Sequence, residues 1–247
     1  MAGPASLGND EVHAWHGIVA GPADRPRNTD LAVLSAAERA RCERFARAAD
    51  GARFAAMHAA VRRLLAGYLP AGAAAIEFGR SQCCECGRDD HGPPRVSWPP
   101  TDVSFNLSGS GGHWLLAVTR RRRVGADIEV PRDLDVAEMA AAALTETERG
   151  YLNAQPQSDR RELFYRCWTR KEAVLKACGV GLAGSLRTLD TQPARVGPVE
   201  LRHRCRGGPG SWRVQDLPSA GGGWIAAVAQ PAADAAAVTL REVPDSF

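Results

Sequence analysis

Residues 124–130 form an apolar run that contains two acidic residues, Asp127 and Glu129. The run predicts a buried strand, and residues i and i+2 of a strand project to the same face. The two carboxylates therefore lie side by side, while Ile128 faces the other way. Two like charges on a mostly apolar strand are costly unless a cation or hydrogen-bond donors satisfy them. Mg²⁺ prefers such oxygen ligands, so a magnesium site on this strand is the natural hypothesis, with a solvated strand face as the alternative.

The chain also carries both of its lysines in one helical segment. Lys171 and Lys176 are the only lysines among 31 basic residues, and they flank Glu172 in the run 168–176. An ammonium group is a compact point charge, whereas the guanidinium of arginine is a planar fork. A site that holds a phosphate beside a metal carboxylate would need the compact form. Glu172 and Lys176 also have the i,i+4 spacing of an exposed helix ion pair, so the spacing alone leaves both interpretations open.

Length and composition limit the class of protein. A chain of 247 residues holds one large domain or two small ones, and its hydrophobic content of 45% is ordinary for a globular protein. A net charge of +3 is too small to indicate nucleic-acid binding. No apolar stretch approaches bilayer length, so we expect no membrane span. The start of the chain has no secretory pattern, and the cysteine number, seven, is odd. We therefore expect reduced thiols and a cytoplasmic protein.

Periodicity and capping patterns predict an alternation of helices and strands. The first 30 or so residues, rich in Gly, Pro, Asn and Asp, are expected to wrap the surface, and residues 79–101 are expected to form a loop. The expected helices are 35–48, 50–69, 136–144, 146–153 and 159–178, and the expected strands are 103–107, 114–119, 124–130, 213–217, 224–228 and 237–243.

Three segments together resemble the Sfp-type 4′-phosphopantetheinyl transferases. They are FNLSGSG at 105–111, VGADIE at 124–129, and FYRCWTRKEAVLK at 164–176, which GVGL follows at 179–182. The G-x-D-x-E and W-x-x-K-E-A-x-x-K patterns of that family are both intact and in order. Either pattern alone is weak, but the two together are specific. The resemblance runs from about residue 35 to residue 185.

The resemblance implies an α+β fold of two similar α/β halves, related by a pseudo-twofold axis, with the active site between them. We expect the first half at residues 1–119, with coenzyme A-binding helices and the Asn-x-Ser loop. The second half is expected at 120–247, with the metal carboxylates and the W-x-x-K-E-A-x-x-K helix. The implied reaction is Mg²⁺-dependent transfer of the phosphopantetheine arm of coenzyme A to a serine of an acyl or peptidyl carrier protein. Adenosine 3′,5′-bisphosphate would leave, and we expect a monomer.

The same resemblance assigns roles to individual residues. Asp127, Glu129 and Glu172 would hold Mg²⁺ against the pyrophosphate and neutralise charge on the bridging oxygen. Lys171 and Lys176 would contact phosphate oxygens, and Lys176 would assist the leaving group.

Further residues are assigned to coenzyme A and to proton transfer. Arg41, Arg44 and Arg53 would bind its phosphates, since a guanidinium suits phosphate, although solvated helix faces explain them equally well. Ser108 and the glycine-rich turn beside it would cradle a phosphate. Glu148 would take the serine proton, but it follows Thr145 by three residues, so a capping box also explains it.

One position departs from the family pattern. The histidine that usually follows the Asn-x-Ser sequence is replaced by Gly109, and the next histidine is His113. This change suggests one rival function, a coenzyme A-binding pseudo-transferase without activity. The other rival is an enzyme, a Mg²⁺-dependent coenzyme A pyrophosphate hydrolase. Cys83, Cys86 and His91 form half of a zinc knuckle, but no second C-x-x-C exists, so we expect a surface loop rather than a metal site. Arginines 120–123 predict either a solvated turn or a docking site for an acidic carrier protein.

Overall fold

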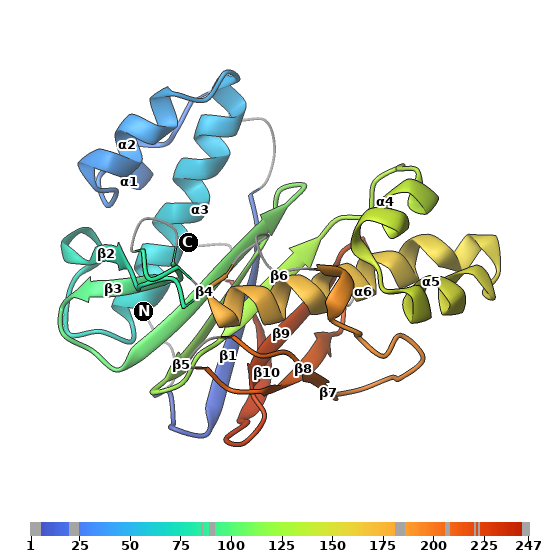
Figure 1. The fold of residues 1–247 in the computed structure, drawn as a ribbon. Coiled ribbons are helices and arrows are strands. Elements are labelled where there is room, and N and C mark those ends of the chain that lie inside the picture. Colours follow the sequence, from blue (N-terminus) through green and yellow to red (C-terminus); the bar gives the residue numbers. More distant parts are fainter. Residues whose placement is uncertain are drawn as a thin grey trace.

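Two four-stranded sheets and a two-stranded hairpin form the framework of the computed structural model of this chain (Figure 1). The structure describes residues 6–19, 25–84, 86–88, 92–180, 186–205, 208–219, 221 and 223–243. The first sheet has the order β10-β1-β5-β4 and consists of β1 (Glu11–Ile18), β4 (Val103–Ser110), β5 (His113–Arg120) and β10 (Ala237–Glu242). The second has the order β6-β9-β8-β7 and consists of β6 (Gly125–Glu129), β7 (Val199–Arg202), β8 (Ser211–Leu217) and β9 (Ile225–Pro231).

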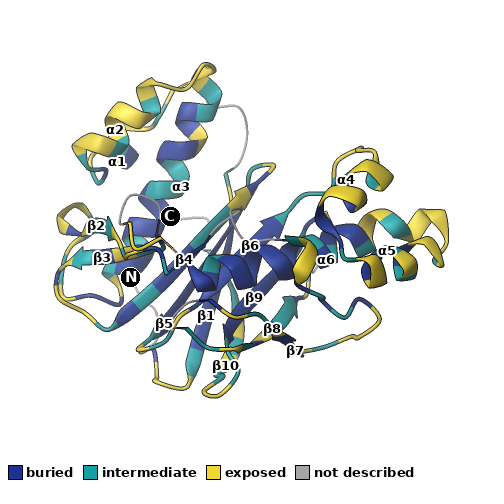
Figure 2. Ribbon diagram, viewed as in Figure 1, coloured by how far each residue is buried: buried dark blue, intermediate teal, exposed yellow. Residues whose placement is uncertain are grey.

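The helices lie outside the two sheets. The first half carries α1 (Asn28–Leu31), α2 (Ala36–Glu43), α3 (Ala48–Ala66) and the hairpin of β2 (Glu77–Arg80) and β3 (Pro94–Trp98). The second half carries α4 (Val136–Ala143), α5 (Glu146–Asn153) and α6 (Gln157–Cys178), and short 3₁₀ turns occur at Ala73–Ala75 and Leu186–Thr188. Outer helix faces are exposed, while β6 and much of α6 are buried (Figure 2). The expected mixed α+β fold is confirmed at this level.

The expectation for the N-terminal segment is wrong. β1 is an inner strand of the first sheet, antiparallel to β5 and parallel to β10, and six of its eight residues are buried. Because both faces of this strand are covered, it lacks the polar alternation that marks a half-buried strand. The expected loop at 79–101 likewise contains most of the β2–β3 hairpin.

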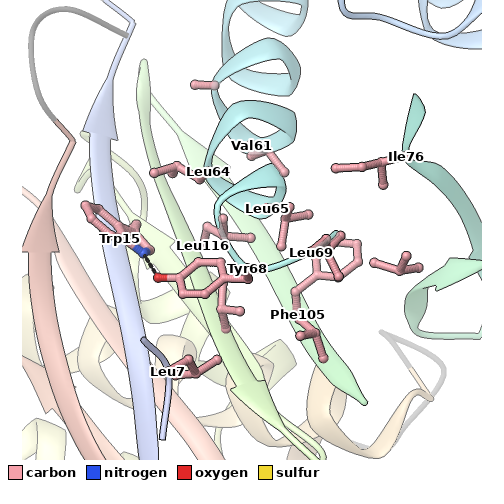
Figure 3. Close-up of a cluster of buried hydrophobic side chains, with 14 of the residues drawn as sticks. Leu7, Trp15, Val61, Leu64, Leu65, Tyr68, Leu69, Ile76, Phe105 and Leu116 are labelled. Atoms are coloured by element: carbon pink, nitrogen blue, oxygen red, sulfur yellow. Dashed lines mark hydrogen bonds between the residues drawn. The ribbon is translucent and has the colours of Figure 1, made fainter. Parts of the chain in front are cut away.

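The core of the first half lies between α3 and the first sheet. Leu64 and Leu65 of α3 pack there with Leu116 of β5 (Figure 3). At the edge of this core, the indole of Trp15 donates a hydrogen bond of 2.7 Å to the hydroxyl of Tyr68. This packing fixes α3 against the sheet that contains β4.

The second sheet is covered by α6, which approaches β6 very closely. A Cβ atom at Gly125 would lie 2.0 Å from the carbonyl oxygen of Ala173, so only glycine permits this contact. The helix ends at Gly179, whose φ of +80° gives the left-handed C-cap that glycine adopts without strain. The glycine of the G-x-D-x-E pattern therefore allows β6 and α6 to approach each other closely.

The two halves meet where β6 lies along β4. The amide of Ala126 donates to Asn106 Oδ1 at 3.1 Å, and the amide of Val130 donates to Ser110 Oγ at 3.2 Å. A third apolar cluster joins the two sheets beneath β6, through Val12, Ala14 and Ile128 among others. β5 of the first sheet ends at Arg120 and β6 of the second begins at Gly125, but β10 returns to the first sheet. The two sheets therefore do not correspond to two contiguous segments of the chain. Among the described residues, no helix is long and apolar enough to cross a bilayer.

Candidate active site

Three carboxylates gather between β6 and α6. Asp127 and Glu129 project from β6 as the strand period predicts, and Asp127 is 3% exposed. Glu172 of α6 is 7% exposed, and Oε1 of its carboxylate has no hydrogen-bond partner. The charges of Asp127 and Glu129 both act on Glu172, which places the three carboxylates in one cluster.

Hydrogen-bond donors from β4 and α6 hold the strand carboxylates. Asp127 Oδ1 accepts from Lys176 Nζ at 2.6 Å and from Ser108 Oγ at 2.8 Å. Glu129 Oε2 accepts from Ser110 Oγ at 2.6 Å. Side chains from both halves of the molecule, on β4 and on α6, therefore bond to the carboxylates of β6.

The cluster has more negative charge than its single ammonium can balance. Burial raises the pKa of Asp127, although Lys176 and Ser108 act in the opposite direction. Burial raises the pKa of Glu172 to about 7, with a further contribution from the charge of Asp127. Burial and neighbouring negative charges both disfavour the ionised form of a carboxyl group and so raise its pKa.

Two buried oxygen atoms of this cluster have no hydrogen-bond partner, Asp127 Oδ2 and Glu172 Oε1. Buried carboxylate oxygens normally have a partner, and these two fit a hard divalent cation. Within the described parts of the chain, no three His, Cys, Asp or Glu side chains stand in an arrangement ready to hold a metal ion. The carboxylates would therefore have to turn toward one another to share a cation.

Lys176 is the cation of the site that remains open to solvent. Its side chain is 25% exposed, and its ammonium also lies 3.3 Å from the carbonyl oxygen of Ala126. A lysine that is anchored on one side and open on the other can contact an incoming anion without leaving its carboxylate partner.

Lys171 and Glu148 lie apart from the carboxylate cluster and pair with each other. Lys171 Nζ is 2.7 Å from Glu148 Oε2, and both side chains are 0% exposed. The same ammonium donates to the carbonyl oxygens of Leu186, at 2.7 Å, and Leu189. Glu148 Oε1 accepts from the amide and the hydroxyl of Thr191, at 2.8 and 2.5 Å. All of these groups have partners within the protein.

Glu148 also completes the capping box that its spacing predicts. Its backbone amide donates to Thr145 Oγ1 at 3.1 Å, and its Oε2 accepts from the amide of Thr145 at 2.8 Å. The residue thus ties the start of α5 to α6 through Lys171.

The three arginines assigned to coenzyme A lie on or beside α2 and α3, and all are exposed. The guanidinium of Arg41 lies 5.0 Å above the ring of Phe54, and Arg53 pairs with Asp50 at 2.8 Å. Arg44 is the C-cap residue of α2. The exposed position of these side chains leaves their outer faces available to an anion.

Gly109 lies on β4 opposite α3. A Cβ atom there would lie 3.3 Å from Met57 Sδ, so any side chain would press on that methionine. Arg53 is one turn before Met57, and residues four apart share a helix face. Arg53 therefore lies on the side of α3 that faces β4, the strand that carries Ser108. The positions of these residues in the sequence do not indicate this proximity.

His113, the next histidine after Gly109 in the sequence, contacts another histidine. Its Nδ1 lies 3.0 Å from Nε2 of His16, and Nδ1 of His16 lies 2.7 Å from Glu242 Oε2. The ring of His16 in turn contacts Trp224. His113 thus belongs to a chain of side chains that runs across the first sheet to β10.

Sequence reasoning missed Asn106 and Ser110. Together with Ser108 they occupy positions i, i+2 and i+4 of β4, and all three side chains bond to β6. Polar residues at every second position of a strand that joins two sheets are the signal that would have identified them.

The remaining motifs take structural places. Arg120 and Arg121 both pair with Asp102, at 2.5 and 3.0 Å. Arg122 is only 9% exposed and donates to two backbone carbonyl oxygens, so the run 120–123 is not a solvated turn throughout. Cys83 and Cys86 lie in the turn between β2 and β3, and His91 falls outside the described residues.

A large groove opens at the end of β6 that carries Glu129. It has a volume of about 1350 Å³ and runs between the α4–α6 helices and the ends of β8 and β9. Ile225 lines it and is the pairing partner of Glu129 across the sheet. Arginines also line the groove, namely Arg149, Arg160, Arg161 and Arg166.

Comparison with known proteins agrees with this geometry. The sequence model of the 4′-phosphopantetheinyl transferase superfamily matches residues 123–229, which include β6 and α6. The 4′-phosphopantetheinyl transferase HetI of Nostoc sp. strain PCC 7120 is 32% identical over 201 residues, covering 77% of this chain and 80% of that protein. The 4′-phosphopantetheinyl transferase Sfp of Bacillus subtilis strain 168 is 25% identical over 183 residues, covering 72% of this chain and 77% of that protein.

Proposed function

This chain belongs to the 4′-phosphopantetheinyl transferase superfamily, and from that membership we propose how its own residues carry out the transfer. The activity is movement of the 4′-phosphopantetheine arm of coenzyme A to a carrier protein. The observation that carries the assignment to a site is the cluster of Asp127, Glu129 and Glu172, with two buried oxygens that lack partners.

Asp127, Glu129 and Glu172 hold Mg²⁺ in this proposal. The unpartnered oxygens and the raised pKa values support this assignment, because an added positive charge would stabilise the ionised form of these carboxyl groups. When bound, the ion neutralises charge on the pyrophosphate of coenzyme A. Ser108 and Ser110 fix the carboxylates of β6 from the opposite half of the molecule.

Lys176 contacts the phosphate from which the leaving nucleotide departs. Its partial exposure and its anchoring by Asp127 support this role, because a preorganised ammonium stabilises charge that develops in the transition state. Lys171 and Glu148 act as positioning residues instead. Their buried pair holds the turn at Leu186–Thr188 against α6, and so fixes the helix that carries Glu172.

Coenzyme A and the carrier approach from different sides. Arg41, Arg44 and Arg53 bind the nucleotide phosphates, supported by their exposure and by the position of α3 over β4. The acyl or peptidyl carrier protein docks at the groove beyond Glu129, because Ile225 lines this groove and pairs with Glu129 across the sheet. We further propose that the halves, divided near residues 119 and 120, are related by a pseudo-twofold axis, and that the protein works as a cytoplasmic monomer.

The decisive experiment combines coenzyme A, Mg²⁺ and an apo carrier protein, and weighs the carrier by mass spectrometry. A gain of the phosphopantetheine mass supports transfer. Nucleotide release without that gain supports the hydrolase, and coenzyme A binding with neither supports the pseudo-transferase.

The site assignment is tested in the same assay. Asp127→Ala and Glu172→Ala should each lower the rate at least 100-fold, because each removes a carboxylate from the metal cluster. Glu200→Ala is the matched control, since Glu200 is an exposed carboxylate on β7 of the same sheet. Near-normal rates in the two site variants would refute the metal assignment, and circular dichroism would verify that each variant is folded.

A further inference from the structure

Three cysteines from distant parts of the sequence converge at the C-terminal end of α6. Cys178 is the last residue of that helix, Cys205 follows β7, and Cys84 lies between β2 and β3. Cys178 and Cys205 belong to the core beneath α6, and Cys84 packs against that core. The thiol of Cys84 donates to the carbonyl oxygen of Cys178 at 3.1 Å. None of the seven cysteines forms a disulfide in this structure.

Cys205 is the centre of this group. Burial raises the pKa of Cys84, the neighbouring Cys205 adds to the effect, and together they bring this pKa to about 11. Burial also raises the pKa of Cys178, and Cys205 is again the neighbour that adds to the effect. The geometry agrees, because the Cys84 thiol and Arg123 Nη1 both contact the carbonyl oxygen of Cys178. Arg123 Nη1 also contacts the Cys205 sulfur, so the three cysteines converge around one guanidinium group.

A positive charge stands beside the same sulfur. Arg123 Nη1 lies 3.9 Å from Cys205 Sγ and 3.4 Å from the carbonyl oxygen of Cys178. Its charge acts to lower the pKa of Cys84 and Cys178, against the larger effect of burial, and the thiolate is the reactive form of cysteine. On another side the backbone closes over the sulfur, since a Cβ atom at Gly208 would lie 2.3 Å from it.

Cys84 is the better partner for Cys205 than Cys178 is. Cys178 is 1% exposed and is held by the last turn of α6. Cys84 is only partly buried and lies outside the helices and strands, so it can both meet solvent and move. A bond from Cys84 to Cys205 would connect the β2–β3 connection of the first half to the segment after β7 of the second.

We propose that Cys84 and Cys205 are a site of reversible oxidation, at which hydrogen peroxide produces a disulfide that links the two halves. One thiol reacts with the peroxide to give a sulfenic acid and water. The other thiol attacks that sulfur, releases a second water and forms the S–S bond. Two thiols and one peroxide thus give one disulfide and two waters, and a dithiol reductant reverses the change. The site is separate from the proposed transfer chemistry.

A metal site is the other use of clustered thiols. Among the residues that the structure describes, no three His, Cys, Asp or Glu side chains are arranged to hold an ion. The C-x-x-C pair seen in the sequence, Cys83 and Cys86, also differs from the pair named here. The arrangement of Cys84 and Cys205 therefore favours a covalent sulfur bond.

The test is differential alkylation of the full chain. Reduced protein is treated with hydrogen peroxide, its remaining thiols are alkylated, and digested peptides are analysed by mass spectrometry before and after reduction. We expect a linked Cys84–Cys205 peptide and a rise of several degrees in melting temperature, both reversed by dithiothreitol. Cys42 and Cys167 should retain the first label.

Cys84→Ser and Cys86→Ser form the matched pair of variants, because the two cysteines are two residues apart in the same segment. Cys84→Ser should abolish both the link and the rise in melting temperature, and Cys86→Ser should leave both unchanged. The proposal is overturned if the wild type shows no linked peptide, if Cys178 or Cys86 is the partner, or if the link forms equally well in guanidinium. Circular dichroism of the reduced variants separates loss of the link from loss of the fold.

Discussion

At the scale of single residues, the two lysines show how the direction of a side chain decides its role. Five helical positions separate Lys171 from Lys176, which turns their side chains about 140° apart around the axis. Lys176 faces β6 and Asp127, whereas Lys171 faces Glu148. The sequence grouped them by type and proximity, but helix geometry already separates them. Which of the two faces the cluster required the position of β6 relative to α6.

Replacing Lys176 by arginine tests whether the site needs a compact charge. The larger fork has to fit between Asp127 and Ser108, which lie 2.6 and 2.8 Å from the ammonium. We expect Lys176→Arg to lower the transfer rate at least tenfold, with the melting temperature within a few degrees of the parent. Arg63→Lys, on the partly exposed face of α3, is a charge-conserving control. A Lys176→Arg enzyme as fast as the parent would contradict the requirement.

The buried pair of Lys171 and Glu148 predicts the opposite behaviour. Lys171→Met leaves the Glu148 carboxylate buried without its cation, which typically costs about 3–5 kcal/mol of unfolding free energy. The double variant Lys171→Met/Glu148→Leu removes both charges, so it should recover part of that loss. Chemical denaturation measures both. A Lys171→Met variant as stable as the parent would contradict a structural pair. A double variant whose loss of stability exceeds the summed losses of Lys171→Met and Glu148→Leu would contradict it as well.

At the scale of elements, the sequence predicted what periodicity encodes and missed what tertiary contacts impose. β6 and α6 were predicted because an apolar run with paired acids and a long capped helix are local signals. β1 was missed because it is buried on both faces and lies near Gly- and Pro-rich segments. The pair of Asp127 and Glu129 was predicted from side-chain direction in one strand, and Glu172 joined them only through the family resemblance. Glu148 was placed by a buried cation that no local pattern reveals.

The attachment of α2 to α3 gives a prediction at this scale. Glu38 lies in the first turn of α2 and contacts His58 at 3.1 Å and Arg62 at 2.7 Å on α3. Burial acts to raise the pKa of Glu38, but hydrogen bonds from His58, Arg62 and Ser35 outweigh it and lower the pKa to about 2. A carboxyl group with a lowered pKa stabilises the fold above its unfolded value of 4.5, and loses that contribution as the pH falls toward 2.

Glu38→Gln should therefore cost about 3 kcal/mol of unfolding free energy near neutral pH and much less near pH 2. Urea titrations of parent and variant at several pH values between 7 and 2 measure the difference. Glu43→Gln, an exposed residue at the end of α2, is the control. A difference between parent and Glu38→Gln that stays constant over this range would refute the linkage.

At the scale of the whole molecule, the site exists because two sheets are joined along β4 and β6. Side chains of β4 bond to the amides and carboxylates of β6, and β10 returns from the end of the chain to pair with β1. The two halves therefore share a core, and one strand of the second half, β10, belongs to the first sheet. We expect them to unfold together rather than as separate domains. Sequence reasoning could place the active site between two halves only through the family resemblance, because no local pattern records which strands of different sheets meet.

Asn106 tests this coupling directly. Its Oδ1 accepts the hydrogen bond of the Ala126 amide at 3.1 Å, and the side chain is 4% exposed. Asn106→Leu leaves that buried amide without a partner, which should cost about 1–3 kcal/mol of unfolding free energy. Scanning calorimetry should show one transition for the parent, and a lower or split transition for the variant, since the altered contact lies between the halves. Asn153→Leu, at the exposed end of α5, should leave the transition unchanged.

Transfer by Asn106→Leu should fall even at temperatures where the variant is folded, because β6 would no longer be held in register with Ser108. Two resolved transitions in the parent would contradict the cooperative joining of the halves.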